Sequence, residues 1–256
     1  MNSPDLHPSL KIPLHKNCQI VGYHSANIWA FNKSYGVLTH PNSGKLSSST
    51  LLHSQYDPKN ECYRWKDDAG NWHSLYLVHR LDSPTSGLLL STTDYEIASQ
   101  LKDAFYKREV QKTYLAVVRS NTLPIRKCWE DNLEKKLIKG KVRVVSGRHG
   151  HLAITHVSIK KRKHTKFGEL LLLEMNPKTG RTHQLRVQSA KRKMPILGDR
   201  TYGDFSLNRK ISQFYKEDRL LLHSASIIIK IKNKHGETIE WKVESSIPNQ
   251  FSKLFD

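Results

Sequence analysis

Asp82 is the residue of this sequence best placed to do chemistry. It lies between two apolar runs, residues 75–78 and residues 88–90, and this pattern predicts a strand, a polar loop and a second strand. A carboxylate between two buried strands is unfavourable unless its charge is paired or used. Asp82 is therefore a candidate catalytic group. The local pattern favours equally an ordinary ion pair with Arg80, in which Asp82 only shapes the following Ser83-Pro84 turn.

Metal and cofactor chemistry has little support in the sequence. The three cysteines are far apart and form no C-x-x-C pair, which favours reduced thiols over disulfides or a zinc site: Cys18, Cys62 and Cys128. A cluster of histidines has no acidic or thiol ligand at a fitting interval, so we expect a loop turn there: His149, His151 and His156. No glycine-rich phosphate loop is present in the sequence. We expect neither a metal nor a cofactor.

The charge balance points to a polyanionic partner. The formal net charge is +19, while 37% hydrophobic and 25% charged residues are ordinary for a folded protein. Between residues 120 and 166, thirteen lysines and arginines stand against three acids. This excess favours an RNA-facing insertion over a merely solvated face. With no signal-like start and no run of 18 apolar residues, we expect a cytoplasmic protein without a membrane partner.

The N-terminal part of the chain is predicted to hold short strands and a long loop. Residues 1–17 are polar and proline-rich and predict a flexible arm, and residues 18–256 predict a single catalytic domain. Strand-like stretches are expected at 19–23, 28–31 and 37–39. The polar stretch 41–74 predicts a surface excursion. Its tryptophans, Trp65 and Trp72, are expected to pack it down, with stacking on bases as the alternative.

The remaining elements alternate helices and strands. Thr93 and Glu96 form a capping box that predicts a helix ending near residues 107–108. Further elements are expected as strands at 110–118 and 169–176, a helix opening on the polar cluster 181–184, a short helix at 211–216, and a hairpin of 220–232 with 237–243. The sum is an α+β fold, with a mixed, mostly antiparallel sheet and flanking helices.

Several separated clusters occur together in one order: His79-Arg80-Leu81-Asp82 with Ser86-Gly87, Lys112-Thr113-Tyr114, Gly180-Arg181-Thr182-His183-Gln184-Leu185-Arg186, and Pro195-Ile196-Leu197-Gly198-Asp199. Each cluster alone is a weak signal, but the ordered set is specific. In this order and spacing the chain resembles the RluA-type family of pseudouridine synthases, which isomerise uridine in ribosomal and transfer RNA. The resemblance runs from about residue 20 to about residue 243.

The resemblance implies a fold and a set of site residues. The expected catalytic domain is α+β, and its central cleft takes a uridine flipped out of the RNA. By their matching positions, Asp82 is the catalytic aspartate, Tyr114 lines the uracil pocket and Arg186 pairs with the aspartate. Arg80 is associated with the space that the base vacates. Four more residues match positions beside the site: His79, Arg181, His183 and Gln184.

The sequence thus predicts an RNA pseudouridine synthase, expected to be a monomer, that acts on a structured ribosomal or transfer RNA. One alternative is an RNA-binding or assembly protein that keeps the fold without the reaction. Another is a glycosylase, which would need a positioned water, and the motifs hold no second carboxylate for it. The chain also departs from the family, since residues 32–36 replace the usual Asn-Lys-Pro before a glycine. We expect this change to relax the turn without affecting the chemistry.

Overall fold

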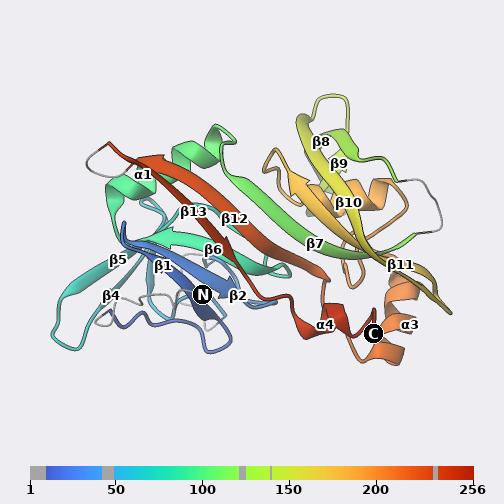
Figure 1. Cartoon of the computed structure of the whole chain (residues 1–256), viewed down its shortest axis with the longest axis horizontal. Helices are drawn as coiled ribbons and strands as arrows, with labels where there is room; N and C mark the ends of the chain where they lie inside the picture. Colours follow the sequence, from blue (N-terminus) through green and yellow to red (C-terminus); the bar gives the residue numbers. More distant parts are fainter. Residues whose placement is uncertain (1–9, 42–48, 121–124, 139, 233–235) are drawn as a thin grey trace. The chain divides into compact units, whose positions relative to one another are not determined.

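The chain forms two compact units. The computed structural model describes residues 10–41, 49–120, 125–138, 140–232 and 236–256 (Figure 1). Unit 1 comprises residues 1–110 and 226–245, and unit 2 comprises residues 111–225 and 246–256. That residues 18–256 act as a single catalytic domain stays a prediction.

Unit 1 is built on a sheet whose strands follow the order β3-β4-β5-β6-β12, with β2 paired to β6 and β1, and β13 paired to β12. Its strands are β1 (Gln19–His24), β2 (Ile28–Lys33), β3 (Gln55–Asp57), β4 (Cys62–Lys66), β5 (Trp72–Leu77), β6 (Ser86–Thr92), β12 (Leu222–Lys232) and β13 (Thr238–Glu244). Neighbours such as β2 and β6 run antiparallel. The predicted mostly antiparallel α+β sheet is confirmed, as is the final hairpin, whose residues 233–235 lie outside the described part.

The prediction of a surface excursion over residues 41–74 was wrong. Outside residues 42–48, which are not described, this stretch forms β3, β4 and the start of β5. Leu51, Leu52 and Tyr63 are fully buried within it. Trp65 packs down as expected and donates its Nε1–H to the Lys11 carbonyl at 3.1 Å, whereas Trp72 is 53% exposed. The stretch therefore supplies part of the core of unit 1.

The ends of two other predicted elements differ. The helix α1 (Tyr95–Tyr106) is capped by Asp94, whose side chain accepts the Glu96 and Ile97 amides, and not by Thr93. A carboxylate one residue later outcompetes the threonine as the acceptor for these free amides. The expected strand at 37–39 is reduced to a single bridge between Leu38 and Thr50.

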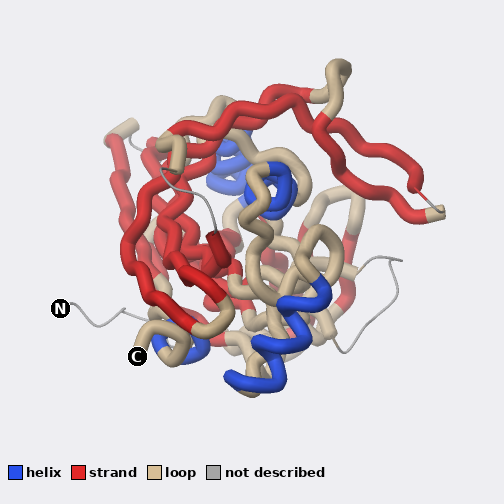
Figure 2. The backbone as a smooth tube through the Cα atoms, turned by 90° about the vertical axis from the view of Figure 1, so that its right-hand side faces the viewer, coloured by secondary structure: helices blue, strands red, loops and turns tan. Residues whose placement is uncertain are grey.

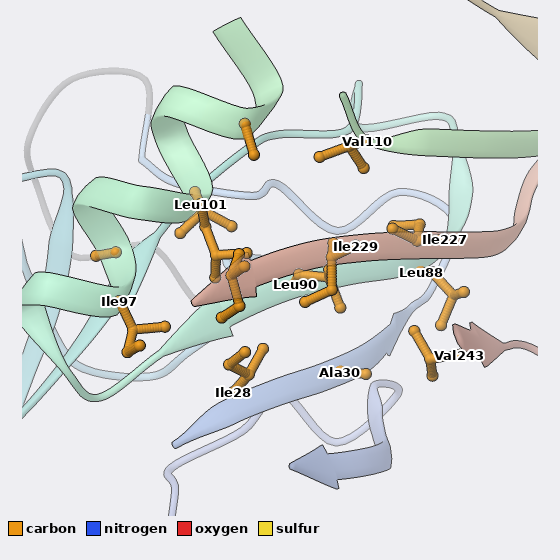
Figure 3. Packing of buried hydrophobic residues seen from close by; sticks show 14 residues of the cluster. Ile28, Ala30, Leu88, Leu90, Ile97, Leu101, Val110, Ile227, Ile229 and Val243 are labelled. Carbon is orange, nitrogen blue, oxygen red and sulfur yellow. The ribbon is translucent and has the colours of Figure 1, made fainter. Parts of the chain in front are cut away.

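The core of unit 1 lies between α1 and the sheet. Buried side chains of α1, including Ile97 and Leu101, face those of β2, β6 and β12, including Leu90 and Ile229 (Figure 3). Part of the expected N-terminal arm is also held in this unit. The His15 amide donates to the Leu51 carbonyl at 2.8 Å, while residues 1–9 lie outside the described part.

Unit 2 has its strands in the order β12-β7-β11-β10-β8-β9. Its own strands are β7 (Gln111–Ser120), β8 (Cys128–Ile138), β9 (Lys141–Ser146), β10 (His151–Thr165) and β11 (Gly168–Pro177), and its helices are α2 (Gln184–Lys191), α3 (Phe205–Tyr215) and α4 (Asn249–Ser252). Strands make up most of the regular structure, and the helices are short (Figure 2). Within the described residues, every helix is too short or too polar to span a bilayer.

In the described part of the basic stretch 120–166, most residues belong to the strands β8, β9 and β10. Along β8 the side chains alternate, with Trp129, Asp131 and Leu133 buried and the residues between them exposed. This period of two is that of a strand with one covered face. His149 lies in the turn between β9 and β10, and among the described residues no group of His, Cys, Asp and Glu could hold a metal ion.

The turn at Gly198 in unit 2 requires a glycine. Its φ is +75°, and a Cβ there would lie 1.8 Å from the Arg219 carbonyl oxygen. Gly140, in the turn between β8 and β9, has a similar φ of +72° but open space around its Cα. Both positions have a left-handed backbone conformation, but only at Gly198 would a Cβ clash with a neighbouring carbonyl.

We therefore expect Gly198→Ala to destabilise unit 2 more than Gly140→Ala does. The left-handed φ costs either alanine about 1–2 kcal/mol. The contact with a backbone carbonyl adds a further 1–3 kcal/mol or so at Gly198, because no side-chain rotation relieves it. Urea unfolding of both variants measures the difference. Equal losses would contradict the close approach at Gly198.

Candidate active site

The loop between β5 and β6 carries Asp82 and is fixed on both sides of it. On one side, the Thr39 hydroxyl donates to the Leu81 carbonyl at 2.9 Å and accepts the Leu81 amide at 3.2 Å. On the other side, the Ser83 carbonyl accepts the Gly36 amide at 2.9 Å, and the Ser83 hydroxyl donates to the Gly36 carbonyl at 2.9 Å. These bonds leave the Asp82 backbone little conformational freedom, so they also restrict the position of its half-buried side chain.

A buried lysine completes this anchorage. Lys33, at the end of β2, is fully buried and donates from Nζ to three carbonyls: Val37 at 2.7 Å, Ser34 at 3.1 Å and Ser83 at 3.2 Å. A lysine rarely has no exposure unless its ammonium hydrogens are taken up in this way. The turn at residues 34–36, where the chain departs from the family pattern, is thus bonded directly to the Asp82 loop.

The other two predicted residues of this loop have different surroundings. His79 accepts the Leu90 amide at Nε2 (2.8 Å), and its ring stacks on Phe105 with centroids 4.6 Å apart. These contacts give His79 a part in holding the loop, and its predicted contact with substrate is untested. Arg80 is exposed.

In unit 2 the predicted site residues lie on β7 and α2. Tyr114 on β7 is opposite Met175 of β11 and is half-buried against the core of this unit. Because Tyr114 is paired within the sheet, its ring is carried by a strand and not by a loop. On the same strand, burial lowers the pKa of the Lys112 ammonium, because the charged group loses contact with water.

Arg186 on α2 has a carboxylate partner that the sequence analysis missed. Its Nε and Nη2 donate to the two oxygens of Asp199 at 2.8 and 2.9 Å, and both residues are buried. Burial alone would raise the Asp199 pKa, but the Arg186 guanidinium and the amides of Thr201 and Tyr202 outweigh it and hold this pKa low. The predicted pairing of Arg186 with Asp82 stays a prediction.

Tyr202 contacts both Arg186 and His183, the residue at the start of α2. The Arg186 guanidinium lies 5.2 Å from the Tyr202 ring centroid. The Tyr202 hydroxyl accepts the Val144 amide at 3.0 Å and is hydrogen-bonded to Nδ1 of His183 at 2.8 Å. His183, the N-cap of α2, has a φ of +53°. Its ring is therefore oriented by Tyr202 rather than by solvent.

Gln184 and Arg181 are used inside unit 2. The Gln184 carbonyl oxygen accepts from the Thr179 hydroxyl (2.7 Å) and the Arg181 amide (3.0 Å), and its amide nitrogen donates to Ile154 and Thr155. The Arg181 Nε donates to the Leu152 carbonyl at 3.3 Å. These bonds fix the start of α2 on β10, so Gln184 supports the helix that carries Arg186. Whether either residue contacts substrate is untested.

Two groups of residues were missed or left without a role by sequence reasoning. For Asp199 and Tyr202 the sequence holds one signal: Asp199 is an acidic residue directly after the apolar run Pro-Ile-Leu-Gly. Lys33 gave a weaker one, a lysine at the end of a largely apolar strand. The bonds that join Lys33 to Ser83 and Arg186 to Asp199 connect residues 50 and 13 positions apart, and no spacing rule predicts them.

Comparisons with known proteins identify the family of the chain. Residues 27–191 match the family described as RNA pseudouridylate synthase. "Ribosomal large subunit pseudouridine synthase C" of Rickettsia bellii is 32% identical over 235 residues, which cover 91% of this chain and 69% of that protein. "tRNA pseudouridine synthase C" of Vibrio cholerae is 31% identical over 216 residues, covering 80% of this chain and 82% of that protein.

Solved structures show the same fold. The structure named "Human RNA Pseudouridylate Synthase Domain Containing 1" aligns with a TM-score of 0.64 at 22% identity, covering 92% of this chain and 86% of that chain. "Human RNA Pseudouridylate Synthase Domain Containing 4" aligns with a TM-score of 0.61 at 21% identity, covering 91% and 90%. At such identities the likeness establishes the fold.

The anchorage of the loop predicts the effect of Lys33→Met. This change removes the donor from one buried and two partly buried carbonyls, and we expect a loss of roughly 1–3 kcal/mol of stability. Amide hydrogen exchange should also accelerate at Gly36 and Thr85, whose amides bond to Ser83 and Asp82. Lys107→Met, at an exposed residue of unit 1, is the control and should change neither measurement. Unchanged exchange in Lys33→Met would refute the anchoring role.

Proposed function

The chain belongs to the RNA pseudouridylate synthase family, and we propose that it converts a uridine of a folded ribosomal or transfer RNA to pseudouridine with Asp82 as the catalytic carboxylate. The observation that carries the assignment is the double anchorage of the Asp82 loop, through Thr39 on one side and Lys33 on the other. A carboxylate held in one place is what a reaction with a single acidic group needs.

The reaction defines what each group must do. The N-glycosidic bond breaks, the uracil rotates, and C5 of the base bonds to C1′ of the ribose before the C5 proton leaves. Asp82 acts at the ribose or the base, either as a nucleophile or by taking a ribose proton. A paired second carboxylate, as in glycoside hydrolysis, has no part in this isomerisation.

Tyr114 and Arg80 are the residues proposed to handle the base and its vacated place. The Tyr114 ring stacks on the uracil, and its hydroxyl assists loss of the C5 proton. A uridine within folded RNA must leave its stack to reach Asp82. The exposed, planar guanidinium of Arg80 fills the space left behind.

The basic strands of unit 2 are proposed to hold RNA phosphates. Exposed cations on β10 include Lys160, Lys161 and Arg162. Such contacts neutralise the backbone without reading its sequence. Recognition of one uridine then comes from the shape of the RNA around it. The enzyme is proposed to act as a monomer in the cytoplasm, where ribosomal and transfer RNA are available to it.

Asp82→Asn should abolish the modification, because an amide can neither attack C1′ nor accept a proton. Pseudouridines are mapped in total RNA from cells lacking the gene, and each variant is then added back. We expect a rate loss on the order of 10³ or more for Asp82→Asn. Asp103→Asn, an exposed aspartate of α1, should restore the modification fully.

Each other outcome of this experiment has a definite meaning. Restoration by Asp82→Asn would remove the catalytic assignment. If deletion of the gene changed no pseudouridine, the alternative of an inactive RNA-binding protein would hold instead. Release of free uracil would identify a glycosylase.

Tyr114→Phe separates the two roles of the tyrosine, because it keeps the ring and removes the hydroxyl. RNA binding should change less than about twofold, while single-turnover rates fall by roughly 10²–10⁴. Tyr106→Phe, at an 86% exposed tyrosine, is the control. A rate equal to wild type in Tyr114→Phe would exclude proton transfer by the hydroxyl.

A further inference from the structure

Three aromatic rings of unit 1 form a stack beside the catalytic loop. The rings of His40 and Tyr56 are nearly parallel, 14° apart in plane, with centroids separated by 5.4 Å. Tyr56 rests in turn on Tyr63 at 5.1 Å, tilted by 59°. Tyr63 is fully buried, whereas His40 and Tyr56 are half-buried. We call His40, Tyr56 and Tyr63 the aromatic ledge.

The ledge is tied to the residues that flank Asp82. The Tyr63 hydroxyl donates to the Thr39 carbonyl at 2.8 Å, and Thr39 precedes His40 in the chain. The Thr39 hydroxyl makes the two hydrogen bonds to Leu81 described above. The stack and the loop are thus joined through one buried residue, and they form a fixed arrangement within unit 1.

Charges of both signs lie near Tyr56, and Arg80 is the cation among them. Burial raises the pKa of Tyr56 to about 12, aided by Glu61, Cys62 and Asp57, while the Arg80 guanidinium acts in the opposite direction. The phenol is therefore neutral under physiological conditions, so it adds no charge that would repel a phosphate. Arg80, which is close enough to influence it, supplies a cation at the same place.

We propose that the aromatic ledge stacks a nucleobase next to the target uridine, and this inference rests on the proposed function. When one base leaves the stack, its neighbour loses a stacking partner, and the ring of His40 at the end of the ledge, supported from behind by Tyr56, replaces it. Stacking on an aromatic ring suits any base, because every base has a π-face. Arg80 takes the vacated space, and the ledge holds the base beside it.

Paired substitutions test the ledge. His40→Leu and Tyr56→Leu remove the ring, whereas His40→Phe and Tyr56→Phe keep it. All four are made in the Asp82→Asn background, so that binding is measured without turnover. The probe is total RNA from cells lacking the gene, with dissociation constants from filter binding. We expect about tenfold weaker binding for the leucine variants, the loss of one base–aromatic stack.

Controls separate stacking from structural damage. The phenylalanine variants should bind within about twofold of the parent, and Tyr106→Leu should have no effect, because that exposed tyrosine lies at the end of α1. After ultraviolet crosslinking to the same RNA, mass spectrometry of the peptides should detect nucleotides attached to His40 or Tyr56. Parent-like binding by the leucine variants, or equal losses in the leucine and phenylalanine variants, would overturn the proposal.

The two proposals fail separately. If Asp82→Asn retained pseudouridine formation, the catalytic assignment would be lost, yet the binding comparison would still decide the ledge, because it requires no turnover. If Asp82→Asn were inactive and the leucine variants bound normally, only the ledge would be excluded.

Discussion

The buried hydrogen bonds of residues 33–39 are the constraint on which the site in unit 1 depends. Ordering a loop residue costs roughly 1–2 kcal/mol of conformational entropy, and a loop that carries a reactive carboxylate gains nothing from that freedom. Here the residues on both sides of Asp82 are bonded to Thr39, Gly36 and Lys33. This conformational entropy is therefore lost on folding. The Asp82 carboxylate is thereby positioned in advance of the proposed reaction.

Unit 2 uses the same principle with different chemistry. The Arg186 guanidinium is held by two parallel bonds to Asp199, and the amides that follow Asp199 hold its carboxylate in turn. Removing either partner would leave a buried charge without compensation, which makes the pair mutually dependent. Both units thus orient a functional side chain through a buried polar network rather than through apolar packing alone.

The sequence predicted elements where one local signal dominated. The strands around Asp82 were predictable because each contains a short uninterrupted apolar run, and β6 is buried along its whole length. The strands β3 and β4 were missed because they are short and lie among polar residues, so their alternation is weak. On β8, the exposed polar residues Glu130 and Asn132 concealed the buried Trp129 and Leu133. The bond from Lys33 to Ser83 and the pair of Arg186 with Asp199 join residues distant in sequence, and no spacing rule predicts such pairs.

The connectivity of unit 1 has a consequence for the order of synthesis. Its core includes Ile227, Ile229 and Ile231 of β12 and Val243 of β13, which are translated after all of residues 111–225. While the chain emerges from a ribosome, residues 1–110 must therefore wait for the rest of their hydrophobic core. During that interval the apolar faces of α1 and β6 are uncovered. These faces can pack on Ile227, Ile229 and Ile231 only after β12 has been translated.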